Sequence, residues 1–269
     1  TLLISSGILT ATCASATART HIMAKSPLTG LLGSTNMGGF FAPELAWAGF
    51  HHLVIKGKAE HPVYISINNG EIEIRDARDI WGKSVTDTQW AIREDLGDEE
   101  VKSCVIGPAG ENRVCFAVIE NDYWRSAGRT GVGAVMGSKM IKAVAFRGDR
   151  KKEWADADQL VDFSREFARR NKDNPGVKAY KTKGTPMLVD IMNDVGGFPT
   201  RYWHKGRSEN RHGFNANALH ERCEVKPHAC LKCFMACGRL SVVKAGRQEA
   251  GDGDLSTPAV DTDGNANLD

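Results

Sequence analysis

The sequence predicts an α+β protein in which a β-rich first part is followed by a mainly helical part. In the first 150 residues, short runs of alternating apolar residues recur between glycine-containing turns, which is typical of strands. After Trp154, apolar residues such as Leu160, Phe163 and Phe167 recur at helical spacing. We therefore expect a β-rich domain over residues 1–150, a helical domain over residues 151–244, and a polar, disordered tail over residues 245–269.

A hairpin is the clearest element of the first part. Val63 to Ile67 and Glu71 to Arg75 alternate on either side of Asn69-Gly70, and an Asn-Gly pair is a strong hairpin indicator. The opening residues lack a preceding basic segment, so they indicate a buried strand and a turn rather than a secretory signal. The other strands expected are Leu2–Ser5, His21–Lys25, His52–Ile55, Val101–Ile106, Val114–Ile119 and Ile141–Arg147.

The helices are predicted from their start and stop residues. One opens at Pro43 and stops at Gly49, and a second runs from about Thr86 to Leu96 before Gly97. In the second part, Asp156 or Asp158 can cap a helix, because a short carboxylate accepts hydrogen bonds from the first free amides. Thr185-Pro186 begins another helix, which ends at Gly196-Gly197.

The overall composition is that of a globular protein. The chain has 269 residues, of which 41% are hydrophobic and 25% are charged, and no apolar run reaches the length of about 18 residues that a membrane span needs. A net charge of +2 gives no argument for a nucleic-acid or membrane partner. The unpaired spacing of the cysteines favours a reducing compartment, so we expect a cytoplasmic protein.

Three thiols lie close together near the end of the chain. Cys230, Cys233 and Cys237 fall within eight residues, whereas the other four cysteines are scattered singly. Such a group indicates metal or cluster ligation rather than a disulfide. Spacing alone leaves three interpretations open: an iron–sulfur cluster, which normally takes four thiolates, a Cys3His zinc site completed by His228, or a set of reduced core thiols.

Glycine-rich basic turns indicate a second kind of site. The segment from Arg125 to Lys139 can bind an anion, because glycines let backbone amides approach a phosphate and Arg125 and Arg129 add guanidinium donors. As a dinucleotide fingerprint it is weak, since its last glycine gap is one residue too long. Two further turns, Arg19–Gly39 and Gly107–Asn112, are expected to join it in one polar-ligand site. The alternative is that these glycines only permit close packing.

Several of these blocks together resemble a known family. MAKSPLTG, NMGGFFAPELAWAGF, IGPAGEN and RSAGRTGVGAVMGSK occur in this order before the thiols, over residues 1 to about 240. They resemble the tungsten-containing aldehyde ferredoxin oxidoreductases. The resemblance implies a β-rich domain that holds a tungstopterin, meaning a bis-molybdopterin with tungsten or molybdenum, followed by helical domains and a [4Fe–4S] cluster. The resemblance also allows a magnesium ion that bridges the pterin phosphates.

The resemblance also implies roles for particular residues. Arg19 is similar to the arginine between pterin and cluster, and Asn36 and Gly38 are similar to the first pterin-contacting turn. The second such turn corresponds to Arg125, Ser126, Gly128 and Arg129. Cys230, Cys233 and Cys237 resemble three of the four cluster ligands, which makes zinc the weaker interpretation. The fourth cysteine and the glutamate and histidine of the family's substrate chemistry have no counterpart here, so no catalytic residue is assigned.

The expected function follows from that resemblance. It implies oxidation of a small aldehyde to a carboxylic acid, with electrons leaving through the cluster to ferredoxin or a similar acceptor. It allows a homo-oligomer and requires neither nucleic acid nor membrane. The alternatives are a tungsten-dependent reductase of an aromatic thioester, a non-catalytic iron–sulfur electron-transfer subunit and a zinc-stabilised binding module. We expect these 269 residues to be a partial chain that is inactive by itself.

Overall fold

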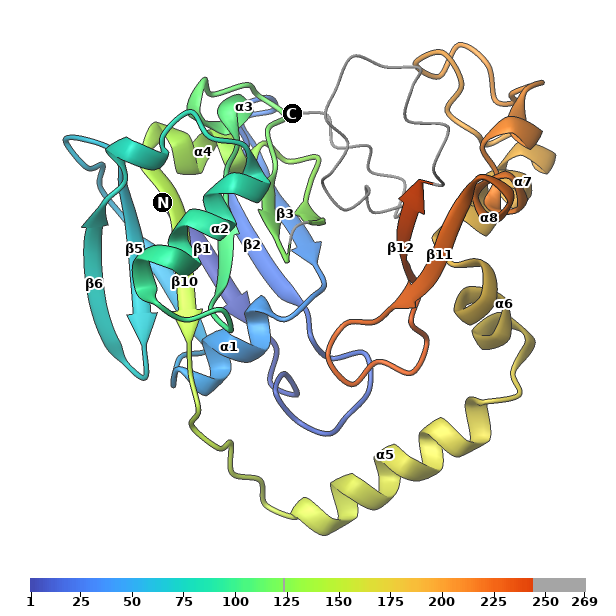
Figure 1. Ribbon diagram of the computed structural model, residues 1–269, viewed down its shortest axis with the longest axis horizontal. Helices are drawn as coiled ribbons and strands as arrows, with labels where there is room; N and C mark the ends of the chain where they lie inside the picture. Colours follow the sequence, from blue (N-terminus) through green and yellow to red (C-terminus); the bar gives the residue numbers. More distant parts are fainter. Residues whose placement is uncertain (123, 244–269) are drawn as a thin grey trace. The chain divides into compact units, whose positions relative to one another are not determined.

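The computed structural model describes residues 1–122 and 124–243, so the predicted tail over residues 245–269 lies outside the described residues (Figure 1). The described residues form two compact units, which are treated separately below. Among the described residues, the first comprises residues 1–164 together with Cys230–Cys233, and the second comprises residues 165–229 and 234–243. The predicted domain limits at residues 150 and 244 stay predictions.

Two sheets make up the β-rich first unit. The four-stranded sheet is antiparallel, in the order β3-β2-β1-β4. Its strands are β1 (Leu2–Ser6), β2 (Thr20–Lys25), β3 (Leu32–Met37) and β4 (His52–Ile55). The six-stranded sheet has the order β6-β5-β10-β7-β8-β9, and within it β10 and β5 are parallel. Its strands are β5 (Val63–Asn68), β6 (Glu71–Asp76), β7 (Lys102–Val105), β8 (Ile119–Asn121), β9 (Arg125–Ala127) and β10 (Ile141–Arg147).

Strand β10 carries the core of this unit. Its successive side chains point to opposite faces, so Val144 and Phe146 join one apolar cluster while Ala143 and Ala145 join another. On the first face, helix α1 (Phe41–Trp47) packs with Phe41 edge-on to Phe146, with ring centroids 5.1 Å apart. Burying one such large apolar side chain contributes about 1.5–3 kcal/mol.

Helix α2 (Val85–Leu96) packs against the second face of the six-stranded sheet, where Ile92 is fully buried (Figure 1). The side chain of Ser84 caps it by accepting from the amide of Asp87, and Gly97 ends it with a φ of 65°. That left-handed conformation favours glycine, so the sequence pattern correctly located the stop. The shorter helices of this unit are η1 (Arg78–Ile80), α3 (Pro108–Glu111) and α4 (Val132–Ser138).

Most of the predicted strands are confirmed, and one is wrong. The hairpin around Asn69-Gly70 forms as β5 and β6, and His52–Ile55 and Ile141–Arg147 have the predicted bounds. The predicted strand Val114–Ile119 is instead a turn that enters β8 only at Ile119, because Val114 bonds back to Ala109 after α3. Strand β3 was predicted as loop, since its glycine and polar residues have low strand propensity and only pairing with β2 orders them.

Helix α5 (Ala157–Asn171) is divided between the units, with residues 157–164 in the first and residues 165–171 in the second. Asp156 accepts a hydrogen bond from the amide of Gln159, as a capping carboxylate does. The remaining elements are α6 (Pro175–Lys183), η2 (Thr185–Met187), α7 (Leu188–Asp194), η3 (Arg211–Gly213), α8 (Ala216–Arg222), β11 (Cys223–His228) and β12 (Gly238–Val243). The helical prediction is confirmed except for the antiparallel hairpin of β11 and β12, which Pro227 and the thiols concealed.

Candidate cofactor site

Strand register brings three of the predicted site residues to one end of a hairpin. Thr20 of β2 pairs with Met37 of β3, so Arg19, which precedes β2, lies beside Gly38, which follows β3. Asn36 is paired one position earlier, with His21. Arg19 and Asn36 are exposed, whereas Gly38 is buried. An exposed guanidinium and an exposed carboxamide therefore lie around a buried backbone turn.

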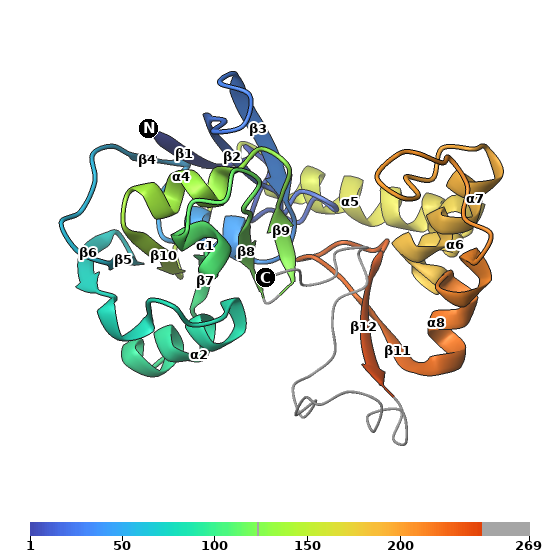
Figure 2. The same cartoon turned by 90° about the horizontal axis from the view of Figure 1, so that it is seen from above.

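The second predicted turn lies beside the first, because the edge strands β3 and β9 of the two sheets are in contact (Figure 2). A Cβ atom added at Gly39 would lie 3.2 Å from Cγ of Arg125, and one at Gly33 would lie 2.9 Å from Cβ of Thr130. The two segments therefore run antiparallel, which places Asn36 alongside Gly128. The sequence predicted that these turns meet, and the sheet edges bring them together.

A buried asparagine holds the two turns together. The Nδ2 amide of Asn121 donates to the carbonyl oxygen of Gly38 and to that of Arg125, each at 3.3 Å. A Cβ atom at Gly39 would lie 2.5 Å from Oδ1 of Asn121, and Gly39 itself has a φ of 98°. Only glycine satisfies both the left-handed backbone and this close approach. The residues around Asn121 in the sequence gave no indication of this role.

The next residue, Asp122, also supports the turn that contains Gly38 and Gly39. Its carboxylate accepts a hydrogen bond from the amide of Phe40, the residue before α1. The side chain is buried, and burial raises the pKa of this carboxyl above its usual value. Asparagine and aspartate in a turn sequence gave no indication of burial, so the sequence did not predict the roles of Asn121 and Asp122. The only available sign was that two Asx residues occur together before the arginine-rich segment.

The two predicted arginines of the second turn differ in exposure. Arg125 is 5% exposed, whereas Arg129 is exposed and has a φ of 73°. The hydroxyl of Ser126 donates to the Glu120 carboxylate across the β8–β9 hairpin. A Cβ atom at Gly128 would meet only Cγ1 of Val118, at 3.6 Å, which is an ordinary contact. Packing therefore does not require glycine at 128.

The glycines that follow are explained by packing. Added Cβ atoms at Gly131, Gly133 and Gly137 would overlap the carbonyl oxygens of Cys115, Val118 and Gly110, respectively. Helix α4 thus lies directly on the backbone of the preceding loop, and the nucleotide fingerprint has no structural support. For these three positions the alternative of close packing is correct.

The third predicted turn, Gly107–Asn112, uses its polar groups inside the domain. Glu111 accepts from the amide of Gly82 with both carboxylate oxygens at 2.9 Å and forms a buried ion pair with Lys142. The Lys142 ammonium also donates to the carbonyl of Lys83 at 2.8 Å. Through Glu111 this turn therefore fastens β10 to the loop after η1, and its part in the polar-ligand site stays a prediction.

Two of the three clustered thiols belong to the first unit. The amide of Cys233 donates to the carbonyl of Cys230 at 3.0 Å, which closes a tight turn. The amide of Gly39 donates to Sγ of Cys230 at 3.3 Å. One predicted cluster ligand thus lies on the turn predicted to contact the pterin.

Cys237 belongs to the second unit, where Arg239 organises its surroundings. The Arg239 side chain is 1% exposed and donates to the carbonyls of Ala236, Gly238 and Tyr180 at 2.6–2.8 Å. The amide of Thr185 donates to the carbonyl of Cys237 at 3.3 Å. Within residues 1–122 and 124–243, no group of three or more His, Cys, Asp and Glu side chains is arranged to hold a metal ion. The ligand set of three thiols stays a prediction.

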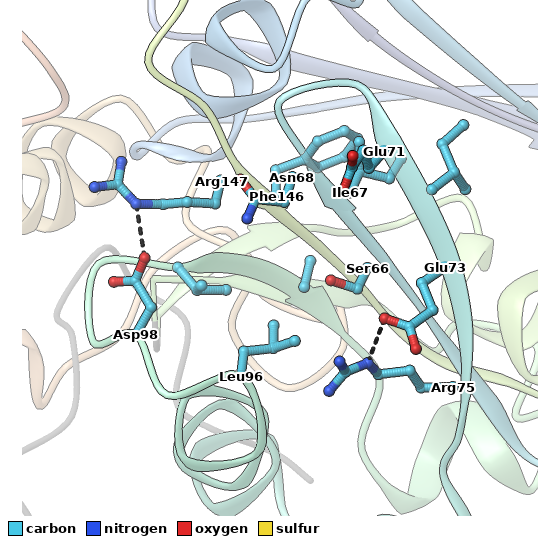
Figure 3. Close-up of a pocket in the computed structure, with 13 residues that line it drawn as sticks. Ser66, Ile67, Asn68, Glu71, Glu73, Arg75, Leu96, Asp98, Phe146 and Arg147 are labelled. Carbon is cyan, nitrogen blue, oxygen red and sulfur yellow. Dashed lines mark hydrogen bonds and ion pairs between the residues drawn. The ribbon is translucent and has the colours of Figure 1, made fainter.

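A separate cavity of about 430 Å³ lies at the other edge of the six-stranded sheet, around β5, β6 and the end of α2 (Figure 3). Four of its charged side chains are paired, Arg147 with Asp98 at 2.9 Å and Arg75 with Glu73 at 2.8 Å. None of the predicted site residues lines it. Because β9 and β6 are opposite edges of the sheet, this cavity is distinct from the turns described above.

The first unit is therefore an α+β domain whose arginine- and glycine-rich turns converge where two sheet edges meet. The family model of the aldehyde ferredoxin oxidoreductase N-terminal domain matches residues 1–148, and the model of domains 2 and 3 matches residues 162–262. The first match alone covers more than half of the chain, so this chain belongs to the aldehyde ferredoxin oxidoreductase family. The second match extends beyond residue 240, where the motif resemblance ended.

Individual relatives agree with this assignment. The tungsten-containing aldehyde ferredoxin oxidoreductases of Pyrococcus furiosus and Pyrococcus abyssi are 42% and 41% identical over 244 residues, which are 89% of this chain. An aliphatic sulfonate oxidoreductase, WOR-like subunit, of Pyrococcus furiosus is 30% identical over 243 residues, which are 85% of this chain and 38% of that protein. The chain spans 40% of the length of the two aldehyde ferredoxin oxidoreductases.

A solved structure has the same fold. The active-site complex BamBC of benzoyl coenzyme A reductase, in complex with 1,5-dienoyl-CoA, superposes with a TM-score of 0.75 and 31% identity. The alignment covers 91% of this chain and 39% of the other. No helix in the described part of the chain is long and apolar enough to cross a membrane.

Proposed function

We propose that this chain provides the pterin-binding domain and part of the cluster-binding region of an oxidoreductase that converts aldehydes to carboxylic acids. In that reaction an aldehyde and water give a carboxylic acid, two protons and two electrons. The electrons leave through a [4Fe–4S] cluster to ferredoxin or a similar acceptor. The observation that carries this proposal is the meeting of the two predicted pterin turns, around Gly38 and Gly128, beside the thiol of Cys230.

The residues at this place fit a tungstopterin. Arg19 and Arg129 present exposed guanidinium groups, which are suited to phosphate because each offers several donors in one plane. Among the described residues, Oγ1 of Thr130 and Oδ1 of Asn121 are buried without a hydrogen-bond partner, as polar atoms are when a ligand completes their environment. When bound, the metal of this cofactor would supply two-electron redox chemistry at an oxygen-transfer centre.

This chain's own residues would then bind and orient. Arg19 and Arg129 would neutralise phosphate charge, and the open backbone at Gly128 would let amides approach the pterin closely. Asn36, exposed alongside Gly128, would hold the same group from the β3 side, and a magnesium ion between the phosphates is compatible with its carboxamide oxygen. Cys230, Cys233 and Cys237 would be thiolate ligands of the cluster.

A reductive reaction on an aromatic thioester is the second candidate. It is favoured by the TM-score of 0.75 with the benzoyl coenzyme A reductase complex. Aldehyde oxidation is preferred, because the aldehyde ferredoxin oxidoreductases are 40–42% identical to this chain, whereas that complex is 31% identical. Both candidates use the same pterin turns, so substrate tests must separate them.

The test is anaerobic purification of the full-length protein that contains this chain, with tungstate and iron in the growth medium. Measurements of tungsten, iron and extractable pterin should find all three. A zinc-stabilised module or a pure electron carrier would contain neither tungsten nor pterin. Viologen reduction that depends on an aldehyde supports the first reaction, and reduction of an aromatic thioester supports the second. Absence of both tungsten and molybdenum from purified protein that contains iron would refute the proposal.

Matched arginine variants test the site itself. Arg129→Gln and Arg19→Gln should lower the pterin retained after gel filtration, because each removes a phosphate-binding cation. Arg78→Gln is the control, since Arg78 is an exposed arginine that pairs with Asp76 in the loop after β6. Equal pterin loss in all three variants would show that general charge, rather than this site, holds the cofactor.

A further inference from the structure

We infer that the Gly38–Gly39 backbone is the positioning element of Cys230, so that the turn proposed to contact the pterin also sets the direction of a cluster ligand. The inference rests on the proposed function for the cluster, but the contact between the turn and the thiol stands independently. Both lie in the first unit, to which Cys230–Cys233 belongs.

The first observation is the hydrogen bond from Gly39 to the sulfur. The backbone amide of Gly39 donates to Sγ of Cys230 at 3.3 Å. An amide that points at a thiolate stabilises its negative charge, and hydrogen bonds to the ligand sulfurs help set the potential of an iron–sulfur cluster. The Gly39 amide therefore fixes one preferred direction for the Cys230 side chain.

The second observation is the space beside Gly38. A Cβ atom added at Gly38 would lie 2.7 Å from Sγ of Cys230, and apart from its chain neighbours no other heavy atom of residues 1–122 and 124–243 lies within 4 Å of it. Gly38 is not among the glycines with positive φ, so an alanine could adopt its backbone conformation. An alanine at position 38 would therefore overlap the Cys230 sulfur, and one of the two groups would have to move.

The turn itself cannot easily move away from the sulfur. Asn121 holds the carbonyl of Gly38, and Asp122 holds the amide of Phe40. On the other side, the bond from the Cys233 amide to the Cys230 carbonyl fixes the backbone of the thiol turn. The softest motion left is rotation of Cys230 about χ1, which would carry Sγ away from the Gly39 amide.

Gly38→Ala is the direct test, and Gly7→Ala is its control. Both glycines lie in the first unit and lack positive φ, but Gly7 is exposed outside the proposed pterin turns, and a Cβ atom there makes an ordinary 3.4 Å contact with Oγ1 of Thr10. In protein stripped of metal under anaerobic conditions, the alkylation rate of each cysteine is measured by mass spectrometry. We expect Gly38→Ala to raise the alkylation rate of Cys230 several-fold relative to Cys104, which is fully buried. An unchanged Cys230 rate in folded Gly38→Ala protein would overturn the inference.

In cluster-loaded protein, a redox titration followed by electron paramagnetic resonance gives a second readout. Loss of the Gly39 donor should shift the midpoint potential of Gly38→Ala to more negative values and alter the spectrum, whereas Gly7→Ala should keep both at the wild-type values. A destabilised fold alone would lower cluster content without changing the potential of the clusters that remain. Identical potentials and spectra in Gly38→Ala and wild type would refute the positioning role.

A further variant covers the case in which Gly38→Ala does not fold. Gly38→Ala combined with Cys230→Ala removes the sulfur and should fold with the melting temperature of Cys230→Ala alone. If the double variant also fails to fold, the sulfur is not what requires glycine at 38, and the inference is wrong. Wild-type protein without iron would instead defeat the proposed function, while the alkylation test would still decide the contact.

Discussion

The side chain of Asn121 donates from one Nδ2 atom to the carbonyl oxygen of Gly38 and to that of Arg125, at 3.3 Å in each case. A single buried amide thus joins the end of β3 to the start of β9, which belong to different sheets. The two turns proposed to contact the pterin are therefore held side by side by this side chain as well as by the strands.

Replacement of Asn121 by alanine should therefore destabilise the first unit. It would leave two buried carbonyls without this donor, at a cost of about 1–3 kcal/mol in the free energy of unfolding. Urea denaturation followed by tryptophan fluorescence measures the change. Asn112→Ala is the control, because the exposed Asn112 bonds only to the nearby Pro108 carbonyl and should change stability by less than about 0.5 kcal/mol. Equal effects would contradict a special role for Asn121.

Lys142→Met should be among the most destabilising single changes in the chain. The side chain of Lys142 is 0% exposed and that of Glu111 is 5% exposed, so the variant leaves a buried carboxylate without its cation. Breaking such a pair costs about 3–5 kcal/mol, and adding Glu111→Gln should recover part of that loss. Urea denaturation compares the single and double variants.

The control for this pair is Lys178→Met. Lys178 and Asp173 form an ion pair at 3.0 Å, but both side chains are more than half exposed, so its loss should cost less than about 1 kcal/mol. A Lys142→Met effect as small as that of the control would mean that the Glu111 carboxylate reaches solvent.

Stability should fall as pH rises, because of Glu44. Burial raises the pKa of this carboxyl from its ordinary value of 4.5 to about 7, although the Gly148 amide and Arg147 oppose the shift. The folded state therefore binds a proton more tightly than the unfolded state. The resulting contribution is fully present below pH 4.5 and is lost as pH rises to about 7, with a total of about 3 kcal/mol.

The free energy of unfolding is measured by urea denaturation at several pH values from about 4 to about 8, a range that spans the titration of Glu44. Glu44→Gln should remove this part of the pH dependence, since a neutral amide has no proton to lose. Glu99→Gln, at an exposed position before β7, should leave it in place. A slope that is unchanged in Glu44→Gln would assign the effect to another group, such as Asp122, whose carboxyl pKa is also raised by burial.

Arg239→Lys should loosen the segment around Cys237. A lysine cannot reach the three carbonyls that the guanidinium satisfies, and the unmet bonds should cost about 2–4 kcal/mol. Hydrogen exchange in β12 and η2 should increase, while exchange in the first unit should not. Arg222→Lys is the control, because Arg222 is exposed at the end of α8. Unchanged exchange in β12 would contradict the anchoring role.

Local sequence chemistry predicted much of this fold. Asn69-Gly70 defined its hairpin, and Gly97 ended α2, because each of these positions needs a backbone that few other residues adopt. By contrast, the strand expected over Val114–Ile119 failed, since the turn after α3 uses the Val114 amide in a bond to Ala109. An alternating pattern describes faces and cannot show whether a partner strand is present.

The sequence by itself determined the family, the glycine and arginine turns, and the three clustered thiols, because these depend on residue type and order along the chain. Only the tertiary structure shows that Asn121 and Asp122 support a turn of the candidate site and that Glu111 of the Gly107–Asn112 turn pairs inside the domain. It also placed Cys230 on the Gly38–Gly39 turn, 191 residues away from it in the chain. Such contacts depend on how two sheet edges pack, and the propensity of each residue for helix or strand does not predict that packing.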